Sequence, residues 1–409
     1  MLQAPDGLPC ALLSINMLNF KIYNDVMGYS EGDALLKAFA RILEREAPRP
    51  VLVARMLADA FLVLFPYKGK EELVTYCEAY SRALNGFIVS REQNYQLELR
   101  SGICCVEDSD ASDINSLLDR ANMALKTIKV KGAAQWKFYD HTMRDKLLRE
   151  KDLEIRMEKA LADGEFLVYI QPKYWVGTRA LAGGEALVRW KSPDQGFLSP
   201  GEFIPLFEKN RFIVKLDQFM FTSVCGLLRQ WLDAGIEPRP LSVNVSRMQF
   251  HTPDFVERYI RIKSQYAIPD GLLELEFTES IFFDNVALLS SAVHELRRAG
   301  IKCSIDDFGA GYSSLNVLKA LPVSVLKLDG MFFRTAKDDE QAKIVIRNIM
   351  RMAGELKMAT VAEGVETHEQ VAFLETTGCD IIQGYVFARP MPAAEFTELL
   401  AGEGGHAER

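Results

Sequence analysis

Eight polar side chains stand in, or directly after, otherwise apolar segments from residue 165 onward. They are Glu185, Asn244, Glu276, Asp306, Asp307, Lys327, Glu363 and Gln383. Single members have simple structural explanations, because an Asp-Asp pair before glycine often forms a turn and Asn244 could cap a helix. A buried carboxylate without a partner costs several kcal/mol. Five carboxylates in such segments therefore indicate that cations neutralise them.

The types of these side chains indicate which cation they would bind. The carboxylates and Asn244 offer oxygen ligands, and neither histidine nor cysteine occurs among them, which favours Mg²⁺ or Mn²⁺. The Asp306-Asp307 pair could bridge or bracket two ions. Two such ions about 3.5 to 4 Å apart suit the in-line hydrolysis of a phosphodiester. The sequence thus predicts a two-metal hydrolytic site.

A barrel would bring these side chains together. Eight strand-like runs alternate with helical stretches from Glu165 onward, which is the number and spacing of a (β/α)8 barrel. The runs are "FLVYIQP", "LAGGEALVRW", "LSVNVS", "LLELEFTES", "KCSIDDFG", "VSVLKLDG", "ATVAEGVE" and "IIQGYVFARP". An open doubly wound sheet is the alternative, although no GxGxxG or phosphate loop accompanies a strand.

The first part of the chain has a different pattern. Residues 1–140 alternate strand and helix signals and predict a compact α/β domain, in which "VLVARM" and "FLVLF" form a hairpin. Residues 141–164 are charged with apolar residues at helical spacing, and we expect a connecting helix there. Residues 165–409 would then form the barrel domain.

Composition limits the class of protein. The 409 residues carry a formal charge of −8 and 48% hydrophobic residues, which is typical of an acidic globular protein and makes nucleic-acid binding an unexpected main activity. Seven cysteines without a CxxC pair indicate reduced, buried thiols. No apolar run reaches the roughly 18 residues of a membrane helix, so we expect a cytoplasmic chain, or a piece of a longer protein.

The motifs of the barrel segment resemble those of EAL-type phosphodiesterases, which hydrolyse cyclic di-GMP to the linear dinucleotide. The similar segments are, in order, "GGEALVRW", "NVS", "ELEFTES", "DDFGAGYSSL", "KLD", "AEGVE" and "QGY". The resemblance covers residues 150 to 400 and implies a (β/α)8 barrel with an intact site.

The resemblance also implies a role for each residue. Glu185, Asn244, Glu276 and Asp306 would bind one metal ion, and Asp306, Asp307 and Glu363 the second.

Lys327 would hold or polarise the attacking water, helped by Gln383. Gln171, Leu187 and Arg189 would contact the substrate, and Glu279 would anchor the loop that follows Asp307.

The first domain resembles a GGDEF domain, the diguanylate cyclase fold, but has lost its chemistry. The signature pentapeptide falls on "LADAF", where Leu57 and Ala58 replace two glycines and Ala60 replaces a glutamate. Asn16 stands at the metal-binding aspartate of the first strand. Synthesis of cyclic di-GMP is therefore not expected.

Other GGDEF positions differ as well. The RxxD inhibition motif is absent near Pro48 to Val51, Leu18 replaces a second aspartate, and Ala133 stands where an arginine is expected, whereas Lys129 is kept.

Some features of that domain persist. Asn24 and Asp33 match the guanine-binding positions, so GTP binding without turnover stays open, as does a purely structural role. The resemblance to EAL domains suggests a homodimer. Two competing functions are a receptor that binds cyclic di-GMP without cutting it and a protein-interaction scaffold.

Overall fold

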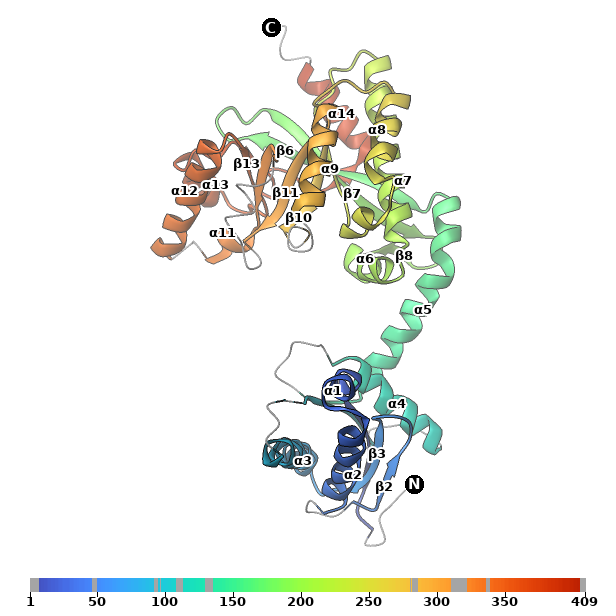
Figure 1. The fold of residues 1–409 in the computed structure, drawn as a ribbon. Helices are drawn as coiled ribbons and strands as arrows, with labels where there is room; N and C mark the ends of the chain where they lie inside the picture. The colour runs from blue at the N-terminus through green and yellow to red at the C-terminus, as the bar shows by residue number, and fades with distance from the viewer. Residues whose placement is uncertain are drawn as a thin grey trace. The chain divides into compact units, whose positions relative to one another are not determined.

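The computed structural model describes residues 7–45, 50–91, 95, 97–107, 113–128, 135–279, 281, 286–309, 322–335 and 339–404. Contacts divide the chain into one unit of Met1–Asp152 and another of Leu153–Arg409. The division falls inside α5 (His141–Ala162), a helix over most of the segment predicted to connect the domains (Figure 1). The exact domain boundaries stay a prediction.

The first unit contains a five-stranded sheet in the order β2-β3-β1-β4-β5. Its strands are β1 (Cys10–Met17), β2 (Leu52–Arg55), β3 (Phe61–Pro66), β4 (Leu99–Cys105) and β5 (Trp136–Phe138). The helices are α1 (Phe20–Met27), α2 (Tyr29–Arg45), α3 (Lys70–Ser90) and α4 (Ile114–Lys126). The β2-β3 pair is antiparallel, which confirms the predicted hairpin.

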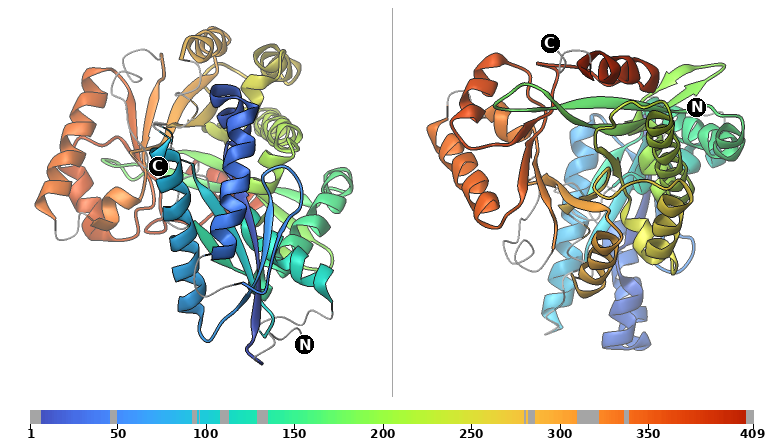
Figure 2. Two further views of the ribbon diagram at one scale, coloured as in Figure 1. Left: turned by 60° about the horizontal axis from the view of Figure 1, so that its bottom comes forward. Right: turned by 90° about the horizontal axis from the view of Figure 1, so that it is seen from above.

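Both faces of this sheet are buried. Leu13 and Ile15 of β1 join a core with α2 and α3, which lie side by side, whereas Cys10 and Leu12 join a second core with α4 (Figure 2). Because successive strand residues point to opposite faces, burial on both sides explains why β1 is apolar along nearly its whole length.

In the second unit, eight strands close into a barrel in the order β6-β7-β9-β10-β11-β12-β13-β14, and β14 pairs back with β6. This confirms the predicted barrel and all eight predicted runs. The strands are β6 (Phe166–Trp175), β7 (Leu181–Ser192), β9 (Leu241–Asn244), β10 (Leu273–Thr278), β11 (Lys302–Phe308), β12 (Val325–Leu328), β13 (Ala359–Ala362) and β14 (Ile381–Ile382). Two short strands, β8 (Gly196–Leu198) and β15 (Met391–Pro392), pair with β7 and β6.

One strand departs from a wholly parallel barrel. β6 runs antiparallel to both β7 and β14, whereas the other described neighbours within the barrel are parallel. The physical reason is the short link from Trp175 to Leu181. A link of this length can join antiparallel strands, while a parallel pair needs a crossover of a dozen residues or more.

Helices cover the outside of the barrel, and α12 lies beside β13 in Figure 1. They are α6 (Pro200–Lys209), α7 (Ile213–Asp233), η1 (Arg247–His251), α8 (Phe255–Gln265), α9 (Val286–Arg298), α11 (Met331–Thr335), α12 (Glu340–Glu355), α13 (His368–Glu375) and α14 (Ala393–Gly404). None of the described helices is both long and apolar enough to cross a membrane.

Candidate active site

The predicted site residues come from different barrel strands and meet at one end. Asn244 is the last residue of β9 and lies beside Glu276 of β10, while Asp306 of β11 lies beside Thr278. Gln171 of β6 pairs with Glu185 of β7. The carboxyl ends of parallel strands converge at one face of a barrel. This convergence brings Gln171 and Gln383, which are 212 residues apart in the sequence, into direct contact.

Lys327 of β12 occupies the centre of this group. Its Nζ lies 2.6 Å from Glu363 Oε1, 3.1 Å from Asp306 Oδ1 and 3.5 Å from Glu185 Oε2. It also donates to Glu276 Oε2. Lys327 is fully buried. Burial alone would lower the pKa of its ammonium group, but the surrounding carboxylates raise it well above its ordinary value, so Lys327 stays charged.

A chain of amide groups orients Glu185. Asn244 Nδ2 donates to Glu185 Oε1 at 2.6 Å, and Gln383 Nε2 donates to Glu185 Oε2 at 2.6 Å. The same Gln383 amide donates to Gln171 Oε1 at 3.1 Å. The structure therefore joins four of the predicted residues in one hydrogen-bonded row.

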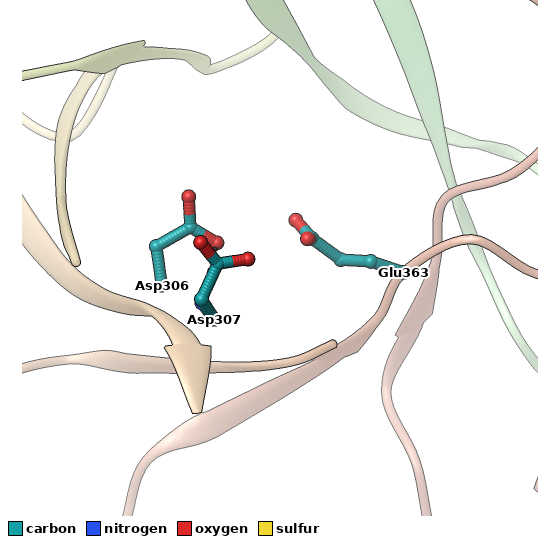
Figure 3. A group of neighbouring side chains, drawn as sticks. All are labelled: Asp306, Asp307 and Glu363. Atoms are coloured by element: carbon teal, nitrogen blue, oxygen red, sulfur yellow. Dashed lines mark hydrogen bonds between the residues drawn. The ribbon is translucent and has the colours of Figure 1, made fainter. Parts of the chain in front are cut away.

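Asp306, Asp307 and Glu363 form a group that could hold a metal ion. One ligand oxygen from each lies within 4.8 Å of the others, and Figure 3 shows the three carboxylates facing one another. The backbone of Asp307 is left-handed, with φ of +54°, and its amide donates to Asp306 Oδ1 at 2.9 Å. This unusual conformation allows two consecutive aspartates to turn toward the same point.

The electrostatics of the site favour added positive charge. Burial raises the pKa of Glu185 and of Glu363, and neighbouring carboxylates add to both shifts. Burial, Asp306 and Asp329 raise the pKa of Asp307 to about 6. These raised pKa values mean that too little positive charge surrounds the carboxylates to balance them. A bound divalent ion would supply that charge. The oxygen donors therefore fit a hard divalent ion.

Lys173 of β6 is a site residue that the sequence analysis missed. Its Nζ lies 2.9 Å from Glu276 Oε1 and 2.7 Å from Ser242 Oγ, and its side chain is buried. Burial would raise the pKa of Glu276, but Lys173 and Lys327 together lower it to about 2. One signal was present in the sequence, since Lys173 follows the predicted Gln171 by two residues and so shares its strand face.

The loop contact predicted for Glu279 is present. The amide of Gly309 donates to Glu279 Oε2 at 3.1 Å. Gly309 has a φ of +93°, and a Cβ there would lie 2.3 Å from ring atoms of Phe332. Residues 310–315 of the "DDFGAGYSSL" motif lie outside the described residues.

Two hollows are lined by predicted site residues. One, of about 260 Å³, is lined by Gln171, Glu185, Leu187, Glu363 and Gln383, among others. The second, of about 220 Å³, is mainly apolar and lies between α6, α7 and the ends of β7 and β9. Leu187 lines both hollows. Arg189 lines the second, where its guanidinium donates to Val188 O and lies over the ring of Tyr169.

The hairpin of the first unit closes at the "LADAF" segment. The amide of Met56 donates to Ala60 O, and Ala58 has a φ of +51° although it is not glycine. Asn16 pairs with Arg100 across β1 and β4.

The two residues predicted to match guanine-binding positions lie on the helices that follow β1. Asn24 lies on α1 with its buried Oδ1 unbonded among the described residues, and Asp33 lies on α2. Pro48, Lys129 and Ala133 lie outside the described residues.

These features define a barrel protein with a carboxylate-rich candidate metal centre at the carboxyl ends of its strands. The model of the EAL domain family matches residues 155–390, and the chain belongs to this family. The model described as "Diguanylate cyclase, GGDEF domain" matches residues 2–135. The predicted tandem arrangement is thereby confirmed.

The chain is similar to several named proteins. It is 30% identical over 392 residues to the bifunctional diguanylate cyclase/cyclic di-GMP phosphodiesterase MucR of Pseudomonas aeruginosa, covering 96% of this chain and 57% of MucR. It is 30% identical over 403 residues to the cyclic di-GMP phosphodiesterase PdeR of Escherichia coli, covering 96% of this chain and 59% of PdeR. The chain thus spans less than two thirds of either relative.

One solved structure, described as the PaMucR phosphodiesterase in a c-di-GMP complex, has a TM-score of 0.57 and 35% sequence identity to this chain. It covers 60% of this chain and 99% of that one.

Proposed function

We propose that the barrel hydrolyses cyclic di-GMP to linear pGpG with two Mg²⁺ or Mn²⁺ ions. The observation that carries this proposal is the arrangement of Lys327 among four carboxylates, beside the Asp306, Asp307 and Glu363 group. The names of MucR and PdeR, and the c-di-GMP complex of PaMucR, support the same substrate.

In this proposal one set of side chains binds the metal ions and another set positions the substrate. Glu185, Asn244, Glu276 and Asp306 would hold one ion, and Asp306, Asp307 and Glu363 the other. The ions, when bound, would polarise the phosphoryl oxygens and lower the pKa of a bound water.

Lys327 would donate an N–H to the attacking water, and its positive charge would offset the negative charge that develops on the phosphoryl oxygens. Gln383 would help to orient that water. Arg189 would contact a phosphate oxygen of the substrate, where a guanidinium forms strong hydrogen bonds.

Leu187 and Gln171 would contact the substrate from the two hollows. The mainly apolar hollow of about 220 Å³ offers room for a base beside Leu187, and the other opens at Gln171 and the carboxylates. A base in the apolar hollow and a phosphodiester in the other would place that phosphodiester beside Glu185 and Glu363.

The first unit would have a regulatory or structural role without cyclase activity. Ala60 and Asn16 remove two metal carboxylates of the GGDEF family. GTP binding would use Asn24 and Asp33. The buried Oδ1 of Asn24 accepts no hydrogen bond from the described residues, so a donor on a bound nucleotide would satisfy it.

Two further features belong to this proposal. We propose a homodimer, on the resemblance to EAL domains, and a cytoplasmic location. All seven cysteines are buried free thiols, which suits a reducing compartment.

The proposal is tested with a matched pair of variants. Purified protein is incubated with cyclic di-GMP and Mn²⁺, and the products are resolved by chromatography. Glu185→Ala is expected to abolish formation of linear product. Glu237→Ala, which removes an exposed carboxylate paired with Arg239 on the surface, is expected to keep it. An unchanged rate in Glu185→Ala would contradict the assignment.

A further inference from the structure

A second tier of polar side chains lies beneath the metal-binding group. Lys173, Ser242, Glu274 and Ser304 are each two residues away from a site residue on the same strand, and all four are buried. Because side chains two residues apart share a strand face, this tier points into the barrel as the site does. Lys173 is the cation in this tier.

Lys173 faces a glycine across the strand pair. Its partner across the β6-β7 pair is Gly183. A Cβ at position 183 would lie 2.4 Å from the carbonyl oxygen of Pro240, so the glycine allows the backbone before β9 to lie against β7.

The contacts of Lys173 are directional. Nζ donates to Glu276 Oε1 at 2.9 Å and to Ser242 Oγ at 2.7 Å, while Lys327 donates to the other oxygen of the same carboxylate. Glu274 and Glu185 add negative charge around Lys173, and Lys327 adds positive charge. Each carboxylate oxygen of Glu276 therefore accepts a hydrogen bond from a different lysine.

We propose that Lys173 is a positioning residue that fixes the Glu276 carboxylate for metal binding and keeps it in place when Lys327 turns to the attacking water. Lys327 contacts three further carboxylates, so it is shared among four groups, whereas Glu276 is the one carboxylate that Lys173 contacts within the described residues. Lys173 lines neither hollow, so it would act on the substrate through the groups around it, with Glu276 as its carboxylate partner. This inference rests on the proposed function.

The test compares Lys173→Met, which keeps the length and removes the charge, with Lys173→Gln, which keeps one hydrogen-bond donor. Residues that orient metal ligands typically change metal affinity or activity by about 10- to 100-fold. We expect Lys173→Met to lower kcat by this amount and to weaken Mn²⁺ binding, measured as free-ion signal by electron paramagnetic resonance. KM for cyclic di-GMP should stay within about threefold. Lys173→Gln should fall between Lys173→Met and wild type.

The controls separate positioning from folding. Lys191→Met changes an exposed lysine of β7 and should match wild type. Ser242→Ala removes the hydroxyl that accepts from Lys173, together with its long 3.4 Å bond to Gly184 O, and should lower kcat about threefold at unchanged KM. If Lys173→Met does not fold, Lys173→Gln and Ser242→Ala decide the question.

Wild-type kcat and Mn²⁺ affinity in these variants would overturn the proposal, as would a loss of thermal stability with unchanged Mn²⁺ binding. Absence of linear product from the wild-type protein would contradict the proposed function alone. The comparison of Mn²⁺ binding would still decide the role of Lys173.

Discussion

Lys327 Nζ lies 2.6 Å from Oε1 of Glu363. This ion pair links the buried strand β12 to Glu363, the residue that directly follows β13. The same ammonium group contacts three other carboxylates. Lys327 thus balances the charge of four site carboxylates, whereas Lys173, a second buried lysine beside the site, contacts Glu276.

Lys327→Met should destabilise the protein in the absence of metal. Removing one partner of a buried ion pair typically costs about 3 to 5 kcal/mol, because the other charge stays buried. Mn²⁺ should restore more stability to this variant than to wild type, since it replaces the lost positive charge. Thermal unfolding in EDTA and in Mn²⁺ measures both effects, and Lys191→Met is the control. Equal melting temperatures in EDTA for Lys327→Met and wild type would contradict this charge balance.

Asp217 should make stability fall as pH rises. Its carboxylate accepts from Ser246 N and Gln249 Nε2, but burial raises its pKa from 3.8 to about 7. The folded state then binds a proton more tightly than the unfolded state, so stabilisation is full below pH 3.8 and is lost as pH rises to about 7. The loss is about 4 kcal/mol at most, from the cost of each pKa unit.

Asp217→Asn removes the titrating group and keeps an oxygen acceptor. Denaturant midpoints between pH 5 and pH 8 should therefore depend less on pH in the variant than in wild type. Parallel pH profiles for the two proteins would show that the pKa of Asp217 is not raised.

The barrel was predictable from sequence because each strand is an apolar run, and a polar site residue stands in that run or directly after it. Lys173 was not predicted because a lysine after proline in "QPKYW" resembles a strand edge. Predicting Lys173 as a site residue would have required the direction of β6, which is antiparallel to β7. On an antiparallel strand the deeper tier comes two residues after the site residue, at Lys173, whereas on β9 and β10 it comes two residues before, at Ser242 and Glu274.

Gly309→Ala should lower kcat by about tenfold or more, because a displaced catalytic group loses its alignment. A Cβ would meet the Phe332 ring at 2.3 Å, so the bond from the Gly309 amide to Glu279 would shift, and Asp307 with it. Gly378→Ala is the matched control. Gly378 also has a positive φ, of +77°, but a Cβ there has nothing within 4 Å. Steady-state kinetics of both variants test this, and equal rates would contradict a steric role for Phe332.

Ala58→Gly should stabilise the first unit without restoring cyclase activity. Ala58 holds a φ of +51°, a conformation that costs an alanine about 1 kcal/mol or more. Part of the gain is offset because glycine is more flexible in the unfolded chain. Calorimetry should show the transition of this unit at a slightly higher temperature. Incubation with GTP and Mg²⁺ should yield no cyclic di-GMP, since Ala60 and Asn16 are unchanged. A lower transition temperature would indicate that Ala58 is not strained.

The central claim is that the barrel cuts cyclic di-GMP rather than only binding it. The most direct measurement follows purified protein at saturating cyclic di-GMP over hours, with Mn²⁺ and with EDTA, and quantifies linear pGpG per protein molecule. We expect many turnovers in Mn²⁺ and none in EDTA. Binding of cyclic di-GMP in Mn²⁺ with no linear product would contradict it and would make the protein a receptor.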